Sequence, residues 1–573
     1  MSSTPARRIL ICGGGVMQVP AIRIATEEGW TVVVADGNPA CPGRLHAHVF
    51  EHIDLKDERS LIDCARRNQV QAVFTAGTDF SLTVARIAEA CGLPGIPVDA
   101  ALHATDKALM RRRLRDRGVS VPPFAVYRHG ERIDGATDVP LPAVVKPVAN
   151  MGARGVRRIT ASEEIAAALA HAEAYSRDGR VIVESFIPGR EYSIDCLVTP
   201  TEKIACGIAD RHIAIPPYFV EIGHTIPSAL PAELQALLTD EFFRAVDAIG
   251  IDCGAAKGDI FLVPDDMRPD WLPGSGPSVV IGEIAARLSG GYMSGWTYPC
   301  ASGIQPTRGA IRIASGATHG TGAPTLRRVV AERAIMSIPG LLNGDIGTGD
   351  ILRLPGVREC FISRSSGDEV SVPTNNVEKC GNLIIEADNR DVLHERIGSV
   401  LRQIVIPLQR AHPKTWTFLL GPDLPDRTAF FADPRFHGPL HPPVSRAAEH
   451  GFVRELSRTL VRSVLDQHAQ AQTSTGDALD GMRSRLRNSR YHETLRDDEQ
   501  DLHAYTRGDA ISVVHEDAGT GTIALPMDLT VCILTLACER GGLQGLRYVI
   551  DTLSEEESCH ALTGFLRQCY ASH

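Results

Sequence analysis

Several common sequence features are missing from this chain of 573 residues. No apolar run reaches the ~18 residues that a membrane-spanning helix needs, and the opening MSSTPARRILIC has no apolar signal-peptide core. The 14 cysteines include no C-x-x-C pair, which argues against a structural zinc site and against a disulfide framework. We therefore expect a cytoplasmic protein with no membrane contact, whose cysteines are reduced and mostly buried.

Positive charge is not concentrated in any broad region. The 69 Asp and Glu residues outnumber the 59 Lys and Arg residues, which gives a net charge of −10, and the basic residues are dispersed apart from Arg111, Arg112 and Arg113. Nucleic acid is therefore not an expected partner, and we predict that the three arginines lie on a solvated helix face. The 43% hydrophobic content is typical of a globular protein. The length predicts about three to five folded units.

Strand-like apolar runs alternate with helix-like segments over the first hundred residues. Such runs are typical of parallel strands covered by helices on both faces, which predicts a doubly wound α/β domain up to about residue 105. The expected strands cover residues 7–12, 30–39, 48–55, 70–77 and 93–97, and the expected helices cover residues 19–29, 57–69 and 79–92.

The first strand-to-helix turn partly matches the pattern of a dinucleotide-binding site. Gly13, Gly14 and Gly15 follow the strand, and Asp36 lies about twenty residues on, where a ribose-binding acid would sit. The third glycine of G-x-G-x-x-G is replaced by Gln18, so the helix cannot pack as closely against the strand and a pyrophosphate. We therefore favour a tight turn without a dinucleotide.

Residues suited to a triphosphate begin after residue 105. TDKALMRRRLRDRGV predicts a helix capped by Thr105 or Asp106, with Lys107 in the first turn, within reach of a phosphate. Further on, the strand-like LPAVVKP carries Lys146 and leads into a glycine-containing loop. A strand lysine beside such a loop neutralises phosphate oxygens while backbone N–H groups approach them. The loop residues are Gly152, Ala153, Arg154 and Gly155.

A candidate base-binding hinge follows in RVIVESFIPGREYSIDCLV. Its backbone groups and carboxylate suit a purine edge, and its apolar side chains suit a purine face. Glu191 offers a second carboxylate to ribose hydroxyls, although each carboxylate taken singly is more typical of a protein surface. The hinge residues are Glu184, Ser185, Phe186 and Ile187.

Two strand-like runs, GAAKGDIFLV and VVIGEIAARLSGG, flank a polar segment rich in Pro and Gly and predict a hairpin. If the hairpin is centred on Trp271, Asp259 lies opposite Glu283. Opposed carboxylates repel unless a proton or cation lies between them, and Mg²⁺ shared with triphosphate oxygens relieves that repulsion. A plain hairpin with solvated acids is the alternative. Beyond it, a cation and backbone N–H groups stand where an acyl phosphate or oxyanion would form. These residues are Arg287, Gly290 and Gly291.

In this order the motifs resemble the ATP-grasp superfamily over about residues 7 to 410. The resemblance implies a multidomain α/β and α+β fold that uses ATP and Mg²⁺ or Mn²⁺, with two ions. It implies that Lys107 and Lys146 contact ATP phosphates, that the hinge binds adenine and Glu191 the ribose, and that Asp259 and Glu283 hold the metal. The expected domains are a preATP-grasp, Rossmann-like domain (1–105), an ATP-grasp core (106–309) including a lid (about 120–190), a C-terminal subdomain (310–412) and an accessory C-terminal α+β domain of unknown role (413–573).

A narrower resemblance is to L-amino acid ligases of the bacilysin synthetase type. It rests on F-V-E-I-G-H-T-I-P, with Glu221 and His224 in a loop-like stretch before Pro227, together with A-R-L-S-G-G. It implies that Glu221 and His224 lie at the amino acid site and that Arg287 holds the substrate carboxylate or its phosphorylated form. The implied activity is a carboxylate-amine ligase that joins small molecules, such as the parts of a dipeptide, through an acyl phosphate and releases ADP and phosphate. Natural product biosynthesis is a plausible setting, and we also expect a homodimer.

Three departures from the family pattern stand out. The E-x-N-x-R metal motif has Ala285 where an amide often helps to hold the second Mg²⁺, so one ion is expected to be held more weakly. Asp259 replaces the commoner Glu, and Asn150 and Ala153 replace serines of the phosphate loop. Similar changes occur among amino acid ligase-like members, so we do not expect a loss of activity.

Two alternatives stay open. A biotin-carboxylase-like or carbamoyl-phosphate-type enzyme shares the scaffold, although the sequence has no A-M-K-M motif and no second ATP-grasp copy. A non-catalytic nucleotide-binding assembly component is the alternative from another class. Residues 413–573 predict helices and a hairpin at AISVVHEDAGTGTIALP, and they are candidates for dimerisation or for recruiting a carrier or partner protein. His515 and Glu516 are more typical of a solvated strand pair than of a metal site.

Overall fold

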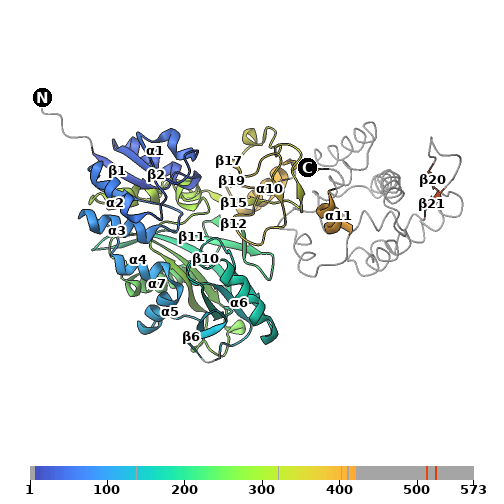
Figure 1. Cartoon of the computed structure of the whole chain (residues 1–573), viewed down its shortest axis with the longest axis horizontal. Helices are drawn as coiled ribbons and strands as arrows, with labels where there is room; N and C mark the ends of the chain where they lie inside the picture. The colour runs from blue at the N-terminus through green and yellow to red at the C-terminus, as the bar shows by residue number, and fades with distance from the viewer. Residues whose placement is uncertain are drawn as a thin grey trace.

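The computed structural model describes residues 7–136, 138–320, 322–401, 403–409 and 412–420, together with two short strands further on. Figure 1 shows the N-terminal domain in blue and the sheet that carries β6 as separate parts of the described chain. Among the described helices, none combines the length and apolarity that a bilayer crossing requires. Described cysteines such as Cys12, Cys64 and Cys196 are free and buried, as expected.

The N-terminal domain is a parallel four-stranded sheet in the order β3-β2-β1-β4. Side chains of alternating strand positions face opposite sides, so Ile9 and Ile11 pack with Ile22 while Leu10 packs with Leu61. This confirms the doubly wound prediction. The elements are β1 (Arg8–Cys12), α1 (Val19–Glu27), β2 (Thr31–Asp36), β3 (Val49–His52), α2 (Glu58–Arg67), β4 (Ala72–Phe74) and α3 (Ser81–Cys91).

The fifth strand expected at residues 93–97 does not form. This segment has no regular structure and leads into α4 (Val98–Thr105). Pro94 and Pro97 have no N–H to donate to a strand ladder, which explains the difference. Helix α5 (Lys107–Asp116) then begins where predicted, with the Asp106 carboxylate accepting a hydrogen bond of 2.9 Å from the Leu109 N–H.

A separate five-stranded sheet, which we call the lid sheet, occupies residues 124–185. Its order is β6-β5-β9-β7-β8, with every neighbouring pair antiparallel. Helix α6 packs against it, and so does Ala108 of α5. It places Lys146 next to Ile182, near the end of the strand that carries Glu184. The elements are β5 (Phe124–Arg128), β6 (Glu131–Gly135), β7 (Ala143–Pro147), β8 (Arg157–Ile159), α6 (Ile165–Ala174) and β9 (Arg180–Ser185).

The largest sheet has eight strands in the order β14-β13-β10-β11-β12-β15-β19-β17. It continues from residue 190 to residue 387, because β12 pairs with β15 beyond the helices that follow β14. The strands are β10 (Arg190–Val198), β11 (Lys203–Ala214), β12 (Val220–Ile226), β13 (Gly254–Val263), β14 (Ser278–Ala285), β15 (Val329–Ile335), β17 (Val357–Ile362) and β19 (Gly381–Ala387).

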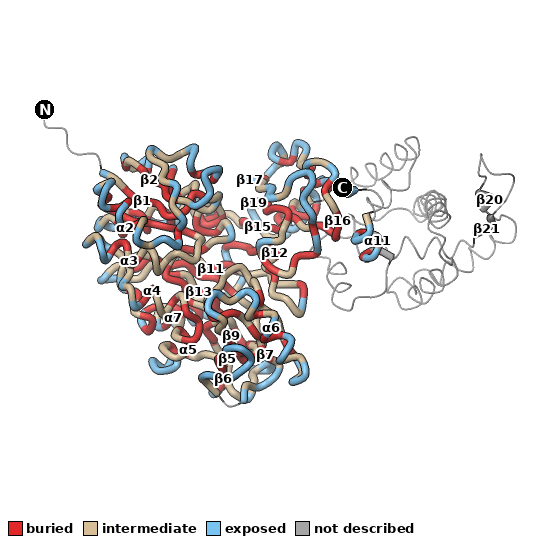
Figure 2. The backbone as a smooth tube through the Cα atoms, viewed as in Figure 1, coloured by how far each residue is buried: buried red, intermediate tan, exposed pale blue. Residues whose placement is uncertain are grey.

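Helices cover this sheet, and Figure 2 shows its strands as mostly buried. α7 packs Phe242 and Val246 against β13 and β14, whereas the strands and helix predicted for residues 310–410 form a further core around Leu383 and Leu393. The remaining elements are α7 (Ala232–Ile249), α8 (Tyr298–Ser302), α9 (Pro306–Ala314), β16 (Gly340–Leu341), β18 (Glu369–Val370), α10 (Arg390–Leu401) and α11 (Pro413–Leu420).

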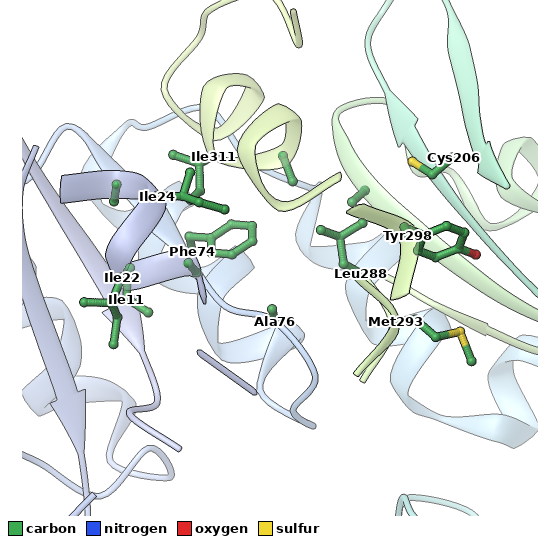
Figure 3. Close-up of a cluster of buried hydrophobic side chains, with 14 of the residues drawn as sticks. Ile11, Ile22, Ile24, Phe74, Ala76, Cys206, Leu288, Met293, Tyr298 and Ile311 are labelled. Atoms are coloured by element: carbon green, nitrogen blue, oxygen red, sulfur yellow. The ribbon is translucent and has the colours of Figure 1, made fainter. Parts of the chain in front are cut away.

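One apolar cluster joins the N-terminal domain to the segment that follows β14. In it, Phe74 and Ile311 pack in the same cluster as Leu288 and Met293 (Figure 3). Deep burial of this kind fixes the position of neighbouring backbone, so the turn that carries Arg287 is held against the N-terminal domain.

Most of the predicted accessory domain lies outside the described residues. Within it, β20 (Ile511–Val513) and β21 (Ile523–Leu525) pair antiparallel, which confirms the expected hairpin. His515 and Glu516 lie outside the described residues.

Candidate functional site

A cavity of about 670 Å³ lies where the N-terminal domain, the lid sheet and the eight-stranded sheet meet. Most of the predicted site residues line it, although they come from segments far apart in the chain. His224 lies behind the wall, and Gly155 packs outside it against Tyr175. The predicted residues that line the cavity are Lys107, Lys146, Gly152, Ala153, Arg154, Glu184, Ser185, Phe186, Ile187, Glu191, Glu221, Asp259, Glu283, Arg287, Gly290 and Gly291.

Positive charge gathers around Glu184 at the end of β9. Its carboxylate contacts Lys146 Nζ at 2.6 Å and Arg111 Nε at 2.7 Å. Burial raises the pKa of Glu184, but the two cations outweigh it and lower the pKa overall. Burial lowers the pKa of Lys146, because it disfavours the charged ammonium. The carboxylate is therefore anchored from both sides.

The prediction that Arg111 is solvated is wrong. Its side chain is buried, and it donates to the Gly282 carbonyl oxygen at 2.6 Å as well as to Glu184. A guanidinium tolerates burial when its donors are paired in this way. Arg112 and Arg113 are less buried, and they contact Asp134 and the Ala248 carbonyl oxygen.

The glycine loop, residues 150–155, contacts Lys107 and the N-terminal domain. Lys107 Nζ donates to the Asn150 carbonyl oxygen at 3.0 Å, and Arg154 lies 4.0 Å from Asp79 of the N-terminal domain. Ala153 has a positive φ of 59°, a backbone conformation that non-glycine residues seldom adopt. Strain of this kind concentrates at functional sites.

Phe186 and Ile187, the two hinge residues that follow β9, form an apolar shelf. Phe186 lies 6.3 Å from Phe219 between ring centroids, and the Arg158 guanidinium is 4.2 Å from the Phe186 ring centroid. Ile187 packs into a small buried cluster with Val263. A flat apolar face bordered by polar groups suits an aromatic base.

Asp259 on β13 pairs with Glu283 on β14, as the hairpin arithmetic predicts. The register then shifts between Asp259 and Ile260, so the hairpin is not symmetric about Trp271 throughout. A bulge of this type is common beside active sites, where it redirects side chains.

Each of these two acids already has cationic partners. Arg211 Nη1 lies 2.8 Å from Asp259 Oδ1, Lys257 Nζ contacts the other oxygen, and Lys107 Nζ lies 2.9 Å from Glu283 Oε1. Burial raises the pKa of Glu283, but Lys107 and Lys257 more than compensate and hold it well below its usual range. The Glu283 carboxylate is therefore held as an anion.

Arg211 and Lys257 were not identified from the sequence. Lys257 lies two positions before Asp259 on the same strand. Because side chains alternate between the two faces of a strand, this spacing was a signal that both residues lie on one face. Arg211 contacts Glu191 and Asp259 through Nη1 and Glu221 through Nη2, the last at 2.8 Å. Nothing local in β11 indicates this, because its partners come from three other strands.

Glu221 and His224 lie on β12 and not in a loop as predicted. An irregularity in the β11–β12 ladder pairs Ile213 with Glu221 and His212 with Gly223, so Ile222 is the extra residue. Because side chains alternate along a strand, positions three apart normally face opposite ways, and the extra residue brings these two to one face. The pattern of a bulge is not visible in the sequence.

The ends of Glu221 and His224 face each other. His224 Nδ1 lies 4.0 Å from Glu221 Oε1 and 3.6 Å from Glu332 Oε2. Glu221 Oε1 and His224 Nδ1 are buried and have no hydrogen-bond partner among the described residues. Buried polar atoms without partners are uncommon, and such atoms beside a cavity point to a polar ligand group.

The turn after β14 is held by the N-terminal domain and by β10. Arg287 Nε donates to the Thr78 carbonyl oxygen at 2.8 Å. A Cβ built on Gly77 would lie 3.1 Å from the Gly290 Cα, so the two glycine backbones approach closely. Asp195 accepts hydrogen bonds from Ser289 Oγ at 2.6 Å and from Ser289 N–H, while burial raises the pKa of Asp195 to about 6.

The donor set at the hairpin fits Mg²⁺. Among the described residues, no three His, Cys, Asp or Glu side chains gather as a metal site. Mg²⁺ binds through one or two carboxylates, with substrate phosphates and water completing its shell, so Asp259 and Glu283 suffice. The absence of an amide at Ala285 leaves these two acids as the available donors in the motif.

Comparisons with known proteins identify the family. Residues 139–261 match the ATP-grasp domain, and residues 334–409 match the L-amino acid ligase C-terminal domain 2. The D-alanine–D-alanine ligase of Syntrophotalea carbinolica is 32% identical over 242 residues, which cover 39% of this chain and 76% of the relative. The chain belongs to the ATP-grasp ligases. As a member of this ADP-forming, C–N bond-forming family, it uses ATP and Mg²⁺.

Two further similarities are more distant. The ATP-grasp ligase chain is 25% identical to carnosine synthase 1 of Gallus gallus over 320 residues, which cover 50% of this chain and 33% of the relative. The crystal structure of the L-amino acid ligase from Bacillus licheniformis superimposes with a TM-score of 0.60 at 19% identity, over 71% of this chain and 100% of that chain. This second similarity shows the fold.

Proposed function

We propose that this ATP-grasp ligase joins the carboxylate of an amino acid or amino-acid-like acid to an amine through an acyl phosphate. The pair Glu221 and His224 carries the proposal, because Glu221 Oε1 and His224 Nδ1 are buried and have no hydrogen-bond partner among the described residues, beside the cavity lined by Asp259 and Glu283. An anionic site for an amine next to a metal-phosphate site is what the reaction needs. When both substrates are amino acids, the product is a dipeptide.

The nucleotide end of the cavity is assigned by charge and shape. Lys107 and Lys146 bind phosphate oxygens, with backbone groups of the glycine loop around them. The hinge from Glu184 to Ile187 holds the adenine, and Glu191 accepts hydrogen bonds from the ribose. Asp259 and Glu283 hold Mg²⁺, which neutralises phosphate charge when it is bound.

The proposed reaction has two chemical steps. A substrate carboxylate oxygen attacks the terminal phosphorus of ATP, the bond to the bridging oxygen breaks, and ADP leaves. The bound ammonium loses one proton to become the neutral amine, whose nitrogen attacks the acyl carbon. Inorganic phosphate departs with the bonding electron pair, and the nitrogen loses its second proton. Both protons pass to solvent by way of the Glu221 carboxylate. Arg287 and the backbone N–H groups of Gly290 and Gly291 stabilise the negative charge on the acyl phosphate.

The amine end is assigned to Glu221 and His224. The Glu221 carboxylate stabilises a substrate ammonium, and His224 orients the incoming nitrogen. Burial raises the pKa of Glu221, but Arg211, His224 and Lys379 outweigh it and lower the pKa overall. Glu221 therefore meets the ammonium as an anion at neutral pH.

ADP and phosphate release with Mg-ATP tests the proposal. The purified full chain is incubated with amino acids singly and in pairs, and products are identified by mass spectrometry. Release that requires two amino acids and yields their summed mass minus water supports the ligase. Release stimulated by bicarbonate alone supports the carboxylase alternative, and nucleotide binding with no release for any acid supports a non-catalytic role. The homodimer and a carrier protein recruited by residues 413–573 remain predictions.

A further inference from the structure

A loop of the C-terminal subdomain, residues 374–379, lies between the glycine loop and Glu221. Asn376 is its central contact. The Asn376 backbone N–H donates to the Gly152 carbonyl oxygen at 2.9 Å, and Asn376 Oδ1 accepts from the Glu221 N–H at 2.8 Å. One residue therefore contacts both the proposed phosphate-binding loop and the proposed amine-binding residue.

The backbone of Glu221 depends on this loop for its hydrogen bonds. The β12–β15 ladder begins at Gly223, so residues 220–222 have no paired residue on β15. Asn376 takes the Glu221 N–H, and Lys379 Nζ donates to the Glu221 carbonyl oxygen at 3.2 Å. Backbone polar groups at an unpaired, partly buried strand end need partners. The 374–379 loop supplies them at the position of the bulge.

The loop is internally braced and so acts as one piece. Glu378 accepts hydrogen bonds from Thr374 N–H at 2.6 Å and from Asn375 Nδ2 at 2.8 Å. Asn375 Oδ1 in turn accepts from the Val377 N–H at 3.1 Å. Because the 374–379 loop is rigid, a displacement of the glycine loop is passed on through Asn376. A flexible loop would absorb the same displacement.

We propose that Asn376 is a positioning residue that links closure of the glycine loop over the nucleotide to the placement of Glu221 for the amine. This deepens the proposed function and rests on it for the role of Glu221. When the glycine loop is held down by a bound nucleotide, Gly152 fixes Asn376, and Asn376 fixes the Glu221 backbone. A bound nucleotide then stabilises the amine site through these two contacts.

The Asn376→Ala variant separates the two contacts. It removes the acceptor for the Glu221 N–H and keeps the backbone donor to Gly152, whereas Asn376→Asp keeps both. Asn38→Ala, an exposed asparagine outside the cavity, serves as the matched control. Hydrogen exchange of the full chain is measured by mass spectrometry with and without Mg-ADP, over peptides that cover residues 148–156 and Glu221.

In the wild type and in Asn376→Asp, Mg-ADP is expected to slow exchange at both segments. In Asn376→Ala it should slow exchange only at residues 148–156. The KM for the amine should rise about threefold to tenfold in Asn376→Ala, as expected for one lost neutral hydrogen bond, with the KM for ATP unchanged. Equal protection of Glu221 in Asn376→Ala and in the wild type would overturn the proposal.

Lys379→Met provides a second variant if Asn376→Ala does not fold. It removes the contact to the Glu221 carbonyl oxygen and leaves the Gly152 contact, so it should weaken the Glu221 response in the same direction. An unchanged response to Mg-ADP in this variant counts against the proposal. A wild-type chain that shows the Mg-ADP response but joins no amino acids contradicts the proposed function and not the link through Asn376.

Discussion

The carboxylate of Glu221 and the imidazole of His224 face each other at 4.0 Å without a hydrogen bond between them. His224 is fully buried and the Glu221 side chain is 13% exposed, and a bulge in β12 brings them to one face of the sheet. This spacing suits the nitrogen of an amine substrate that donates a hydrogen bond to the Glu221 carboxylate and contacts the His224 ring.

Glu221→Gln is expected to weaken binding of the amine. An ammonium bound to a carboxylate loses a charge-assisted hydrogen bond in this variant, so the KM for the amine should rise about 10- to 100-fold. The KM for ATP should change little. Steady-state ADP release at varied amine and varied ATP measures both. Glu233→Gln, an exposed acid in the first turn of α7, should match the wild type; an unchanged amine KM in Glu221→Gln would remove Glu221 from the amine site.

Glu283→Gln is expected to abolish Mg²⁺-dependent turnover with the fold intact. An amide oxygen is a weaker Mg²⁺ ligand than a carboxylate, and Asp259 alone would remain in the pair. ADP release is measured over a range of Mg²⁺ concentrations, with circular dichroism as the check on folding. Asp270→Asn, an exposed acid in the same hairpin, is the control. Wild-type rates in Glu283→Gln would contradict the metal assignment.

Arg211→Met is expected to destabilise the fold by about 3 to 5 kcal/mol near pH 8, because three acids lose a shared buried cation. Without Arg211 the pKa values of Glu191 and Glu221 rise in the folded state. A carboxyl group whose pKa is raised in the folded state contributes fully to stability only at a pH below its unfolded-state pKa. That contribution is lost as the pH rises through its folded-state pKa. The loss in Tm should therefore be smaller at pH 5 than at pH 8.

Arg128→Met, on the exposed end of β5, provides the comparison for Arg211→Met. It should lower the Tm by little at either pH. A Tm loss in Arg211→Met that does not depend on pH would show that packing, and not the charge of the three acids, explains the effect.

Asp195→Asn is expected to become more stable relative to the wild type as the pH rises. Burial raises the pKa of Asp195 to about 6 from an ordinary value of 3.8, so in the wild type the folded state loses stability as this carboxyl ionises. Between pH 4 and pH 7 the difference in unfolding free energy should move by about 2 kcal/mol in favour of the variant. Denaturant unfolding at several pH values measures it, and a constant difference would contradict the raised pKa.

The order of motifs and the pairing of Asp259 with Glu283 followed from the sequence. A hairpin with a clear polar turn fixes which residues face each other near its centre, and the resemblance to a known superfamily supplied the roles. Lys107 and Lys146 could be placed because each belongs to a strong local pattern, a capped helix and an apolar strand. These features depend on residues close together in the chain.

Arg111, Arg211 and the geometry of Glu221 could not be predicted in this way. Arg111 stands in a run of three arginines on a helix, and only the packing of β9 and β14 against that helix decides which of them is buried. Arg211 contacts acids from β10, β12 and β13, so its role depends on the order of strands in the sheet. The bulge in β12 depends on the ladder that β11 forms with it.

The ion pairs at the hairpin affect the order in which Mg²⁺ and ATP bind. Lys107 holds Glu283, and Arg211 with Lys257 holds Asp259, so a bare Mg²⁺ ion would have to displace ammonium and guanidinium groups that then lack partners. In the proposed site, the phosphates of ATP would give those cations new partners as the acids are released. Kinetically, the two should therefore arrive as a single Mg-ATP complex, and metal affinity measured without nucleotide should be low.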